Sequence, residues 1–358
     1  MITITANHEA ASRERRAICI LGMHRSGTSA LARLLNILGV YLGEPDRLLA
    51  ADDAVNPEGF WEHVGIMKCQ DRLLHALGRT WYDPTPLPEG WISSADCRSC
   101  KDDLLSIIEE EFADKAIWGW KDPRTCLLLP MWDELACSLG LRIDYVMIVR
   151  NPLDVAASLS KRDAMLVDES LPLWLYYVLS ALHGARRGRR CVVLYDRLLA
   201  CWHEEMKRIS GHLTIPWPSD EENIAAEVAR FLKPTLRHAS SSLEDLATTE
   251  TNDSAVMETY RLCLNAVEDE ALLESTAAID KVNNLYRGYL LSQELIDDRL
   301  RTYFTNKNRE VQLRIEELRL RTHQVKVLEG QIQDILNTVS WRITRPLRWA
   351  GERIFRSR

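Results

Sequence analysis

The chain of 358 residues lacks the long apolar run that a membrane-spanning helix needs. No stretch of about 18 apolar residues occurs anywhere along it. Residues 1–16, MITITANHEAASRERR, are polar and charged and lack the apolar core of a signal peptide. We therefore expect neither a membrane span nor a secretion signal, and we interpret residues 1–16 as a disordered lead.

The chain also lacks a cysteine pattern typical of disulfides or metal sites. Several of its nine cysteines lie inside apolar runs, as Cys19, Cys126 and Cys191 do, which is how a free thiol behaves as a small hydrophobe. Cys97 and Cys100 form one CxxC pair without a second pair or a histidine at ligand spacing, so we expect one helical turn and no metal. Free cysteines and the missing signal predict a cytoplasmic protein.

Charge of one sign is unevenly distributed along the chain. The net charge is -7, yet residues 301–358 hold 13 Lys and Arg against 6 Asp and Glu, so the rest is strongly acidic. An acidic body argues against nucleic-acid binding. With 46% hydrophobic and 27% charged residues, the composition suits a soluble globular protein that has a full core.

Four short apolar runs are typical of buried parallel strands: 17–22, 116–121, 143–149 and 191–195. Segments of helical period lie between them: 28–38, 64–77, 97–113, 125–139, 152–161 and 172–187. This alternation predicts an α/β domain over residues 17–240, with three α/β/α layers around a mostly parallel central sheet.

A helical extension is expected after this domain. Residues 241–254 are rich in Ser, Thr and acids and predict a linker, and residues 255–300 have helical period. Within 301–339, Val311, Leu318, Val325, Ile332 and Val339 fall seven apart. This spacing predicts a coiled coil that joins copies of the chain as a homo-oligomer. A helix packed on its own domain is an equal alternative.

The tail, residues 340–358, mixes arginines with large apolar side chains in SWRITRPLRWAGERIFRSR. Basic amphipathic segments with tryptophans bind anionic membrane surfaces, so we expect peripheral contact with the inner membrane face. Docking on a partner protein or on the coiled coil stays open.

The strongest motif follows the first apolar run, in AICILGMHRSGTSALARLLN. A strand ends near Gly22, a tight loop ends at Gly27 and a helix begins near Thr28. Such a junction directs backbone N–H groups and the positive helix end toward one point, where a phosphate binds. Gly27 permits close approach, Thr28 and Ser29 offer hydroxyls, and Arg25 offers a forked cation.

A nucleoside-triphosphate loop reads GxxxxGK[ST], but Thr28 stands here where that lysine belongs. The lysine that reaches the β- and γ-phosphates is therefore missing, and no Asp directly follows the run 143–149 as a magnesium ligand. A donor with a single 5'-phosphate and a sulfate needs neither group. A P-loop kinase acting on a nucleotide or a sugar remains an alternative.

The sequence HRSGTS after a strand resembles the 5'-phosphosulfate loop of the sulfotransferases, in the bacterial and Golgi-type form with arginine before Ser-Gly. The resemblance implies a P-loop-like sulfotransferase fold and the donor 3'-phosphoadenosine 5'-phosphosulfate (PAPS), with adenosine 3',5'-bisphosphate (PAP) as product. It also implies that the 5'-phosphate is held by Arg25, Ser26, Gly27, Thr28 and Ser29.

A second motif, YVMIVRNPLDVAASLSKR, again joins a strand to a helix. Asn151 suits the N-cap and Pro152 the first turn, while Arg150 and Ser158 lie two helical turns apart and can reach one anion. In sulfotransferases an arginine at a strand end and a serine eight residues later bind the 3'-phosphate. The resemblance assigns these roles to Arg150 and Ser158.

The resemblance covers residues 17–240 and leaves out the C-terminal third. VVLYDRLL is similar to the family strand after the 3'-phosphate helix, which implies that Tyr195 lies near the adenine. FLKPTLRH stands where the family has a basic loop that closes over the 3'-phosphate, which makes Lys233 and Arg237 candidates there.

Sulfuryl transfer needs a cation for the departing phosphate oxygen. WGWKDPRT offers Lys121 and Arg124 at a strand end, and the family often has such a lysine near the transferring group. Sulfotransferases of small molecules have a histidine two residues after this lysine, where this chain has Pro123. A histidine base is therefore not expected at that position.

The reaction also needs a base for the acceptor proton. Other branches of the family use a glutamate between the first helix and the next, which in NPEGFWEH points to Glu62. Glu44, Glu58 and His63 are the alternatives, and an acid that merely starts a helix is an equal interpretation of Glu62. His24 lies nearer the donor and is interpreted as a binding group.

Several aromatic residues are expected around the acceptor: Trp61, Trp81, Tyr82 and Trp91. They can stack on sugar faces, although core packing explains them nearly as well. A coiled coil with a basic tryptophan tail also resembles C-terminal extensions of bacterial enzymes that build surface polysaccharides. These features predict a carbohydrate acceptor, a surface polysaccharide or its lipid-linked precursor. A non-catalytic PAP-binding assembly protein is the second alternative.

Overall fold

The computed structural model describes residues 15–52, 59–232, 241–248, 254–338 and 342–344. The chain divides into two units, Met1–Leu291 and Ser292–Arg358. No helix among the described residues has an apolar stretch long enough to cross a membrane. The first unit holds the sheet and both predicted phosphate elements.

Four parallel strands form the sheet, in the order β2, β1, β3, β4. They are β1 (Arg15–Leu21), β2 (Trp118–Lys121), β3 (Leu141–Val149) and β4 (Arg190–Leu194). All four expected strands are present, and their ends differ by at most two residues from the predicted ones. The predicted parallel sheet is therefore confirmed.

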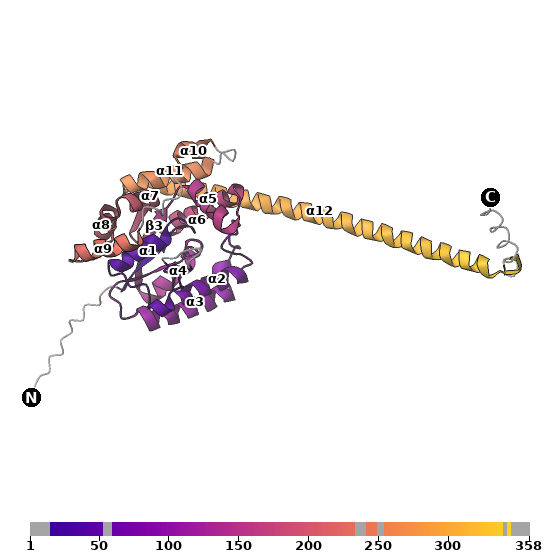
Figure 1. Cartoon of the computed structure of the whole chain (residues 1–358), viewed down its shortest axis with the longest axis horizontal. Coiled ribbons are helices and arrows are strands. Elements are labelled where there is room, and N and C mark those ends of the chain that lie inside the picture. Colours follow the sequence, from indigo (N-terminus) through magenta and orange to yellow (C-terminus); the bar gives the residue numbers. More distant parts are fainter. Residues whose placement is uncertain (1–14, 53–58, 233–240, 249–253, 339–341, 345–358) are drawn as a thin grey trace, which may run out of the picture. The chain divides into compact units, whose positions relative to one another are not determined.

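Helices cover both faces of the sheet (Figure 1). In β1, Ala17 and Cys19 point into one hydrophobic core, while Ile18 and Ile20 point into another. The core of Ile18 contains α1 (Thr28–Ile37), α7 (Tyr195–Ala200), α8 (Trp202–Leu213) and α9 (Glu221–Phe231). The core of Ala17 contains α2 (Val64–Ala76), α3 (Ala95–Ile107), α4 (Thr125–Leu139), α5 (Pro152–Asp163), α6 (Val167–Gly184) and α11 (Ser254–Glu268). The strands are mostly apolar because both faces of the sheet are buried, as the three-layer prediction requires.

Shorter elements complete the first unit. A π-helix, η3 (Ile108–Phe112), continues α3, and the described residues also form the 3-10 turns η1 (Pro45–Arg47), η2 (Trp91–Ser93) and η5 (Leu272–Glu274). Part of the expected linker forms α10 (Leu243–Ala247). The first unit thus continues beyond residue 240 to Leu291.

A single helix of 62 residues, α12 (Thr276–Asn337), takes in parts of the two helical segments that the sequence suggested. Its first turns pack on the first unit, where the ring of Tyr289 stacks on Tyr176 at 5.4 Å and its hydroxyl donates to the carbonyl oxygen of Pro84. In the second unit its large apolar side chains are exposed, Val311, Leu318, Val325 and Ile332 among them.

Candidate active site

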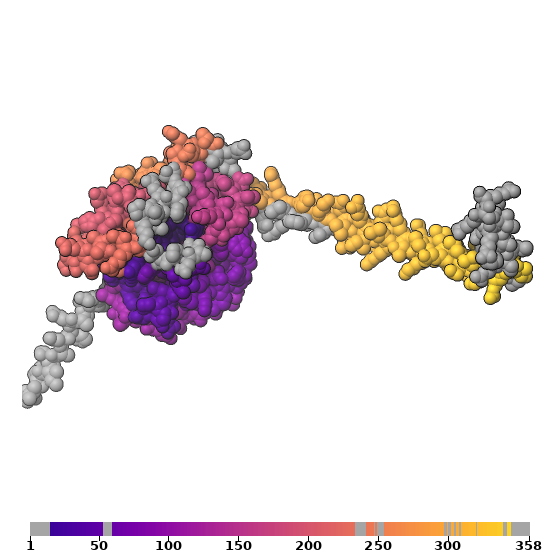
Figure 2. All heavy atoms as spheres, in the orientation of Figure 1, coloured from indigo at the N-terminus to yellow at the C-terminus, as the bar shows by residue number. Residues whose placement is uncertain are grey.

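The carboxyl ends of β1, β2 and β3 meet at one edge of the sheet because the strands are parallel. Each strand continues there into a loop and then a helix, α1, α4 or α5. The predicted motifs HRSGTS, KDPRT and RNPLD contain these three loops and the first residues of the helices that follow. In Figure 2 the surface of the first unit is hollowed at a place where deep indigo atoms, which belong to the earliest described residues of the chain, are visible.

The loop after β1 folds as a phosphate loop does. Gly27 is the N-cap of α1 with φ 92°, and no side chain caps this helix. The first-turn N–H groups of a helix have no partner within it, so this end suits an anion. Ser26 and Thr28 are buried, and the backbone N–H of Ser26 donates to Met23 O over 3.2 Å, which closes the turn. Arg25 has φ 67°, a conformation that a non-glycine residue rarely adopts.

The loop after β3 carries the second predicted element. Asn151 caps α5, because its Oδ1 accepts a hydrogen bond of 2.9 Å from the N–H of Leu153. Pro152 occupies the first turn, where its missing N–H costs nothing. Arg150, immediately before the cap, is buried at the end of β3, and its Nε lies 3.9 Å from Asp154 Oδ2.

The two loops contact each other through the residues that the sequence singled out. Arg25 Nε donates to Ser158 Oγ over 2.8 Å, and Arg150 Nη1 donates to the carbonyl oxygen of Arg25 over 3.3 Å. The Arg150 guanidinium lies 4.6 Å from the ring centroid of Tyr195. Four of the predicted donor-binding residues therefore form one cluster.

Tyr195 closes this cluster from the start of α7. A Cβ atom placed on Gly27 would lie 2.2 Å from the Tyr195 ring, so the ring packs directly on the loop backbone. Burial raises the pKa of Tyr195, which therefore stays a neutral phenol. Tyr195 therefore joins the loop after β1 to Arg150.

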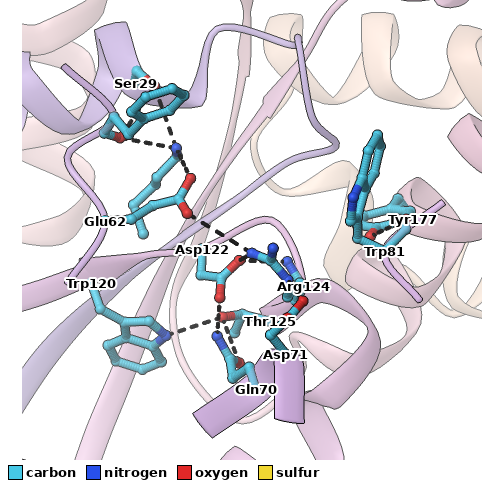
Figure 3. A network of polar contacts seen from close by, with 12 residues as sticks. Ser29, Glu62, Gln70, Asp71, Trp81, Trp120, Asp122, Arg124, Thr125 and Tyr177 are labelled. Atoms are coloured by element: carbon cyan, nitrogen blue, oxygen red, sulfur yellow. Dashed lines mark hydrogen bonds and ion pairs between the residues drawn. The ribbon is translucent and has the colours of Figure 1, made fainter. Parts of the chain in front are cut away.

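Lys121, at the end of β2, links Ser29 in the first turn of α1 to Glu62, and both of these partners are labelled in Figure 3. Its Nζ lies 2.5 Å from Glu62 Oε1, 3.0 Å from the carbonyl oxygen of Phe60 and 3.3 Å from Ser29 Oγ. These contacts match the three N–H donors of an ammonium group. Lys121 and Glu62 are both buried, so neither charge is screened by water.

A buried polar network holds Arg124 below this pair (Figure 3). Arg124 lies 3.0 Å from both Asp71 Oδ1 and Asp122 Oδ1, and 3.9 Å from Glu62 Oε2. Gln70 Nε2 donates to Asp122 Oδ2 over 2.7 Å. Burial raises the pKa of Asp122, and the positive charge of Arg124 partly opposes that rise. Burial lowers the pKa of Arg124, but the nearby carboxylates outweigh burial, so the pKa of Arg124 is raised. The network therefore fixes a permanent positive charge beside Glu62.

Asp122 and Gln70 were not predicted as site residues. A signal for Asp122 existed, since an acid directly after the apolar WGWK run is unusual unless it is paired. Gln70 lies on α2 and bonds residues more than 50 positions away, among them Thr125 and Trp132. No local pattern reveals such contacts.

The alternative bases have other partners. His63 caps α2, and its Nε2 lies 2.7 Å from Glu111 Oε2. Glu44 accepts a hydrogen bond of 3.0 Å from the hydroxyl of Tyr41. Glu58, together with the predicted basic loop residues Lys233 and Arg237, lies outside the described residues.

An arginine side chain lies over each of two rings that were predicted to stack on sugars. The Arg33 guanidinium lies 4.5 Å from the ring centroid of Trp61, and that of Arg162 lies 5.0 Å from Trp81. Tyr82 packs edge-on against Trp81 and is 54% exposed. Among these aromatics, Tyr82 offers the more open surface. Trp91 lies in the turn η2 and packs against the core.

The described residues contain no group of His, Cys, Asp or Glu side chains arranged to hold a metal ion.

No known protein-family profile matches this chain, and no curated protein matches it. Among solved structures, it is similar to the sulfotransferase domain from the Synechococcus PCC 7002 olefin synthase, at 16% identity and a TM-score of 0.42, covering 70% of this chain and 95% of that one. The sulfotransferase domain from the curacin biosynthetic pathway matches at 14% identity and 0.36, covering 70% and 92%. The mouse sulfotransferase SULT7A1 complexed with PAP matches at 16% and 0.33, covering 77% and 89%.

Proposed function

We propose that this protein is a sulfotransferase that moves a sulfuryl group from PAPS to a hydroxyl of a carbohydrate acceptor. The main support is that the two predicted phosphate-binding elements lie side by side. Arg25 Nε and Ser158 Oγ are 2.8 Å apart, although 133 positions separate them in sequence. A donor with one phosphate at the 5' position and another at the 3' position of one nucleoside needs two such elements side by side.

The residues of the cluster fit such a donor. The N-terminus of α1 and Arg25 suit the 5'-phosphate, because helix ends and guanidinium groups both bind phosphate oxygens. Arg150 and Ser158 suit the 3'-phosphate, and the Tyr195 ring suits the adenine between them. Thr28 stands where a kinase has its lysine, and this substitution argues against a triphosphate.

Lys121 and Glu62 are the proposed catalytic pair. PAPS supplies the sulfuryl group and leaves as PAP. Lys121 stabilises the departing phosphate oxygen by exchanging its longest contact, 3.3 Å to Ser29 Oγ, for that oxygen. Glu62 takes the proton of the acceptor hydroxyl, whose oxygen forms the new bond to sulfur while the bond from sulfur to the 5'-phosphate breaks. Lys121 Nζ lies 2.5 Å from Glu62 Oε1 and Arg124 Nη1 lies 3.9 Å from Glu62 Oε2, so two cations stand beside the proposed base.

The proposed acceptor is a surface polysaccharide or its lipid-linked precursor. Exposed aromatic surface at Tyr82 supports a sugar, because rings stack on apolar sugar faces. The nine free cysteines support work in the cytoplasm, where thiols stay reduced. We further propose that the basic tail 340–358 rests on the inner membrane face, where a lipid-linked acceptor is found.

Calorimetric titration of the full chain with PAP, with AMP and with ATP plus Mg²⁺ tests the donor assignment. We expect PAP to bind at least about 100-fold more tightly than AMP, because two charge-assisted contacts contribute about 1.5–3 kcal/mol each. A preference for ATP with Mg²⁺ would assign the protein to the kinases. Tight PAP binding without turnover of PAPS would support the assembly protein instead.

The double variant Arg150→Ala with Ser158→Ala tests the second site separately. It should abolish the preference for PAP over AMP, since AMP has no 3'-phosphate for these two residues to bind. Unchanged affinity for PAP would remove the 3'-phosphate assignment while leaving the first loop in place.

A further inference from the structure

His24 lies in the loop between β1 and α1, and two aromatic side chains hold its ring. The ring centroid is 4.6 Å from that of Trp81 and 5.8 Å from that of Tyr177. The hydroxyl of Tyr177 donates to the carbonyl oxygen of Trp81 over 2.7 Å and so ties the Tyr177 side chain to the Trp81 backbone. The imidazole therefore has little freedom to turn away from the loop.

The Nε2 atom of His24 is buried and has no hydrogen-bond partner among the described residues. Buried polar atoms in proteins are nearly always paired. Arg25, Lys121 and Arg124 are close enough to act on this imidazole, so an anion held by these cations is a candidate partner for Nε2.

Four cations act on this imidazole: Arg25 of the same loop, Lys121 at the end of β2, Arg124 in the loop that follows, and Arg162 of α5. Tyr177 of α6 faces it as a neutral phenol, because burial raises the pKa of Tyr177 well above 10. Burial first, and then these cations, hold the pKa of His24 well below 6.5. Without a ligand, the side chain is therefore neutral at pH 7.

We propose that His24 takes up a proton when the anionic donor binds and that its imidazolium Nε2–H then donates a hydrogen bond to that donor. This inference rests on the proposed function, since it needs a phosphate or phosphosulfate anion in the loop. The anion offsets the cations that keep the proton away, and its oxygens accept from the imidazolium. His24 then adds a positive charge to the site only while the donor is present.

The direction of the pH effect follows from linkage. Donor binding raises the pKa of His24, so binding takes up a proton at pH values between its free and bound pKa. Affinity for the donor then rises as pH falls through that window, by at most about tenfold per pH unit for one proton. The phosphates of the donor titrate near pH 6 as well, so the contribution of His24 is measured as a difference between variants.

The test is titration of the full chain with PAP in buffers of different ionisation enthalpy, which counts the protons taken up. His24→Asn keeps a polar side chain that cannot titrate. His183→Asn is the control, because His183 is another histidine whose pKa burial lowers, but it stacks on Tyr286 outside the two loops. We expect wild type and His183→Asn to take up more protons than His24→Asn, with a difference that shrinks as pH rises.

Equal proton uptake by wild type and His24→Asn would overturn this inference and leave the proposed function standing. No binding of PAP by wild type would overturn the proposed function itself. A second measurement does not depend on a variant: NMR titration of the His24 imidazole in wild type should show a higher midpoint with PAP than without. An unchanged midpoint in the PAP complex would also overturn the inference.

Discussion

Gly27 and Gly39 share a left-handed backbone conformation, with φ angles of 92° and 95°. Their surroundings differ, because a Cβ at Gly27 would lie 2.2 Å from the Tyr195 ring, whereas a Cβ at Gly39 would meet nothing within 4 Å. Both Gly27→Ala and Gly39→Ala should lower the free energy of unfolding by about 1–2 kcal/mol through the positive φ. Only Gly27→Ala should displace Tyr195 and weaken PAP binding, by at least about tenfold.

Urea unfolding and calorimetry with PAP measure the two effects on the same samples. Equal PAP affinities in the two alanine variants would mean that Tyr195 does not need its packing on the loop to support the nucleotide.

The base is tested by Glu62→Gln, which keeps the shape of the side chain but removes its ability to take a proton. PAP affinity should stay within a few fold of wild type, while release of PAP from PAPS in the presence of acceptor should fall by about 10²–10⁴-fold. Glu44→Gln is the comparison, since that side chain bonds Tyr41 rather than Lys121. Full turnover by Glu62→Gln would pass the base role to Glu44, Glu58 or His63.

At this scale the sequence could predict residues that stand at a fixed offset from a strand end. Arg25, Lys121 and Arg150 are such residues, and parallel strands bring them to one edge. It could not predict the partners of Lys121 and Arg124, because Glu62 and Asp71 reach them from a segment with no strand of its own. It also could not show that Nε2 of His24 finds no hydrogen-bond partner in the described part of the chain, because the position of that ring depends on packing against Trp81 and Tyr177.

Among the elements, α5 begins at a cap that also holds a distant segment. Asn151 Oδ1 accepts from Leu153 N, and its Nδ2 donates to the carbonyl oxygen of Ser241 over 2.7 Å. Asn151→Ser should keep the cap but fail to reach Ser241, and Asn151→Ala should lose both bonds. We expect unfolding free energies in the order wild type, Ser, Ala, with about 1 kcal/mol at each step.

Thermal and urea unfolding of the three proteins measure this order. If the serine and alanine variants are equally stable, the cap itself contributes nothing and the tie to Ser241 accounts for the whole effect.

The element boundaries show where periodicity is informative. The strands were predicted closely because each apolar run, buried on both faces, gives way to a polar loop. This change occurs at Gly22, Lys121 and Arg150. The extent of α12 was not predicted, since a helical period in the sequence looks the same in one continuous helix and in two consecutive helices. Gly288 and Gly330 lie inside α12, where each costs about 1 kcal/mol without ending the helix.

For the whole molecule, we propose that the second unit joins copies of the chain through the stripe of Val311, Leu318, Val325 and Ile332. These side chains are 51–61% exposed, and an isolated helix of this kind gains stability by burying such a stripe. Leu318→Glu should convert an oligomer to a monomer. Leu313→Glu should not, because Leu313 is 68% exposed but lies off the stripe.

Light scattering at several concentrations measures the mass of each variant. A monomeric wild type would contradict this assembly, and dissociation by Leu313→Glu as well would show that the contact face is not the heptad stripe.

The distribution of thiols in the folded chain has a practical consequence. Seven of the nine cysteines are buried, and Cys137 and Cys201 are exposed. Burial raises the pKa of Cys126 and Cys263 to about 12, so these thiols neither meet a reagent nor form the thiolate that reacts with it. An alkylating reagent therefore has two targets in the native state and nine in the unfolded chain. The number of modified cysteines per molecule, followed over time, therefore measures how often the first unit opens, and no engineered label is needed.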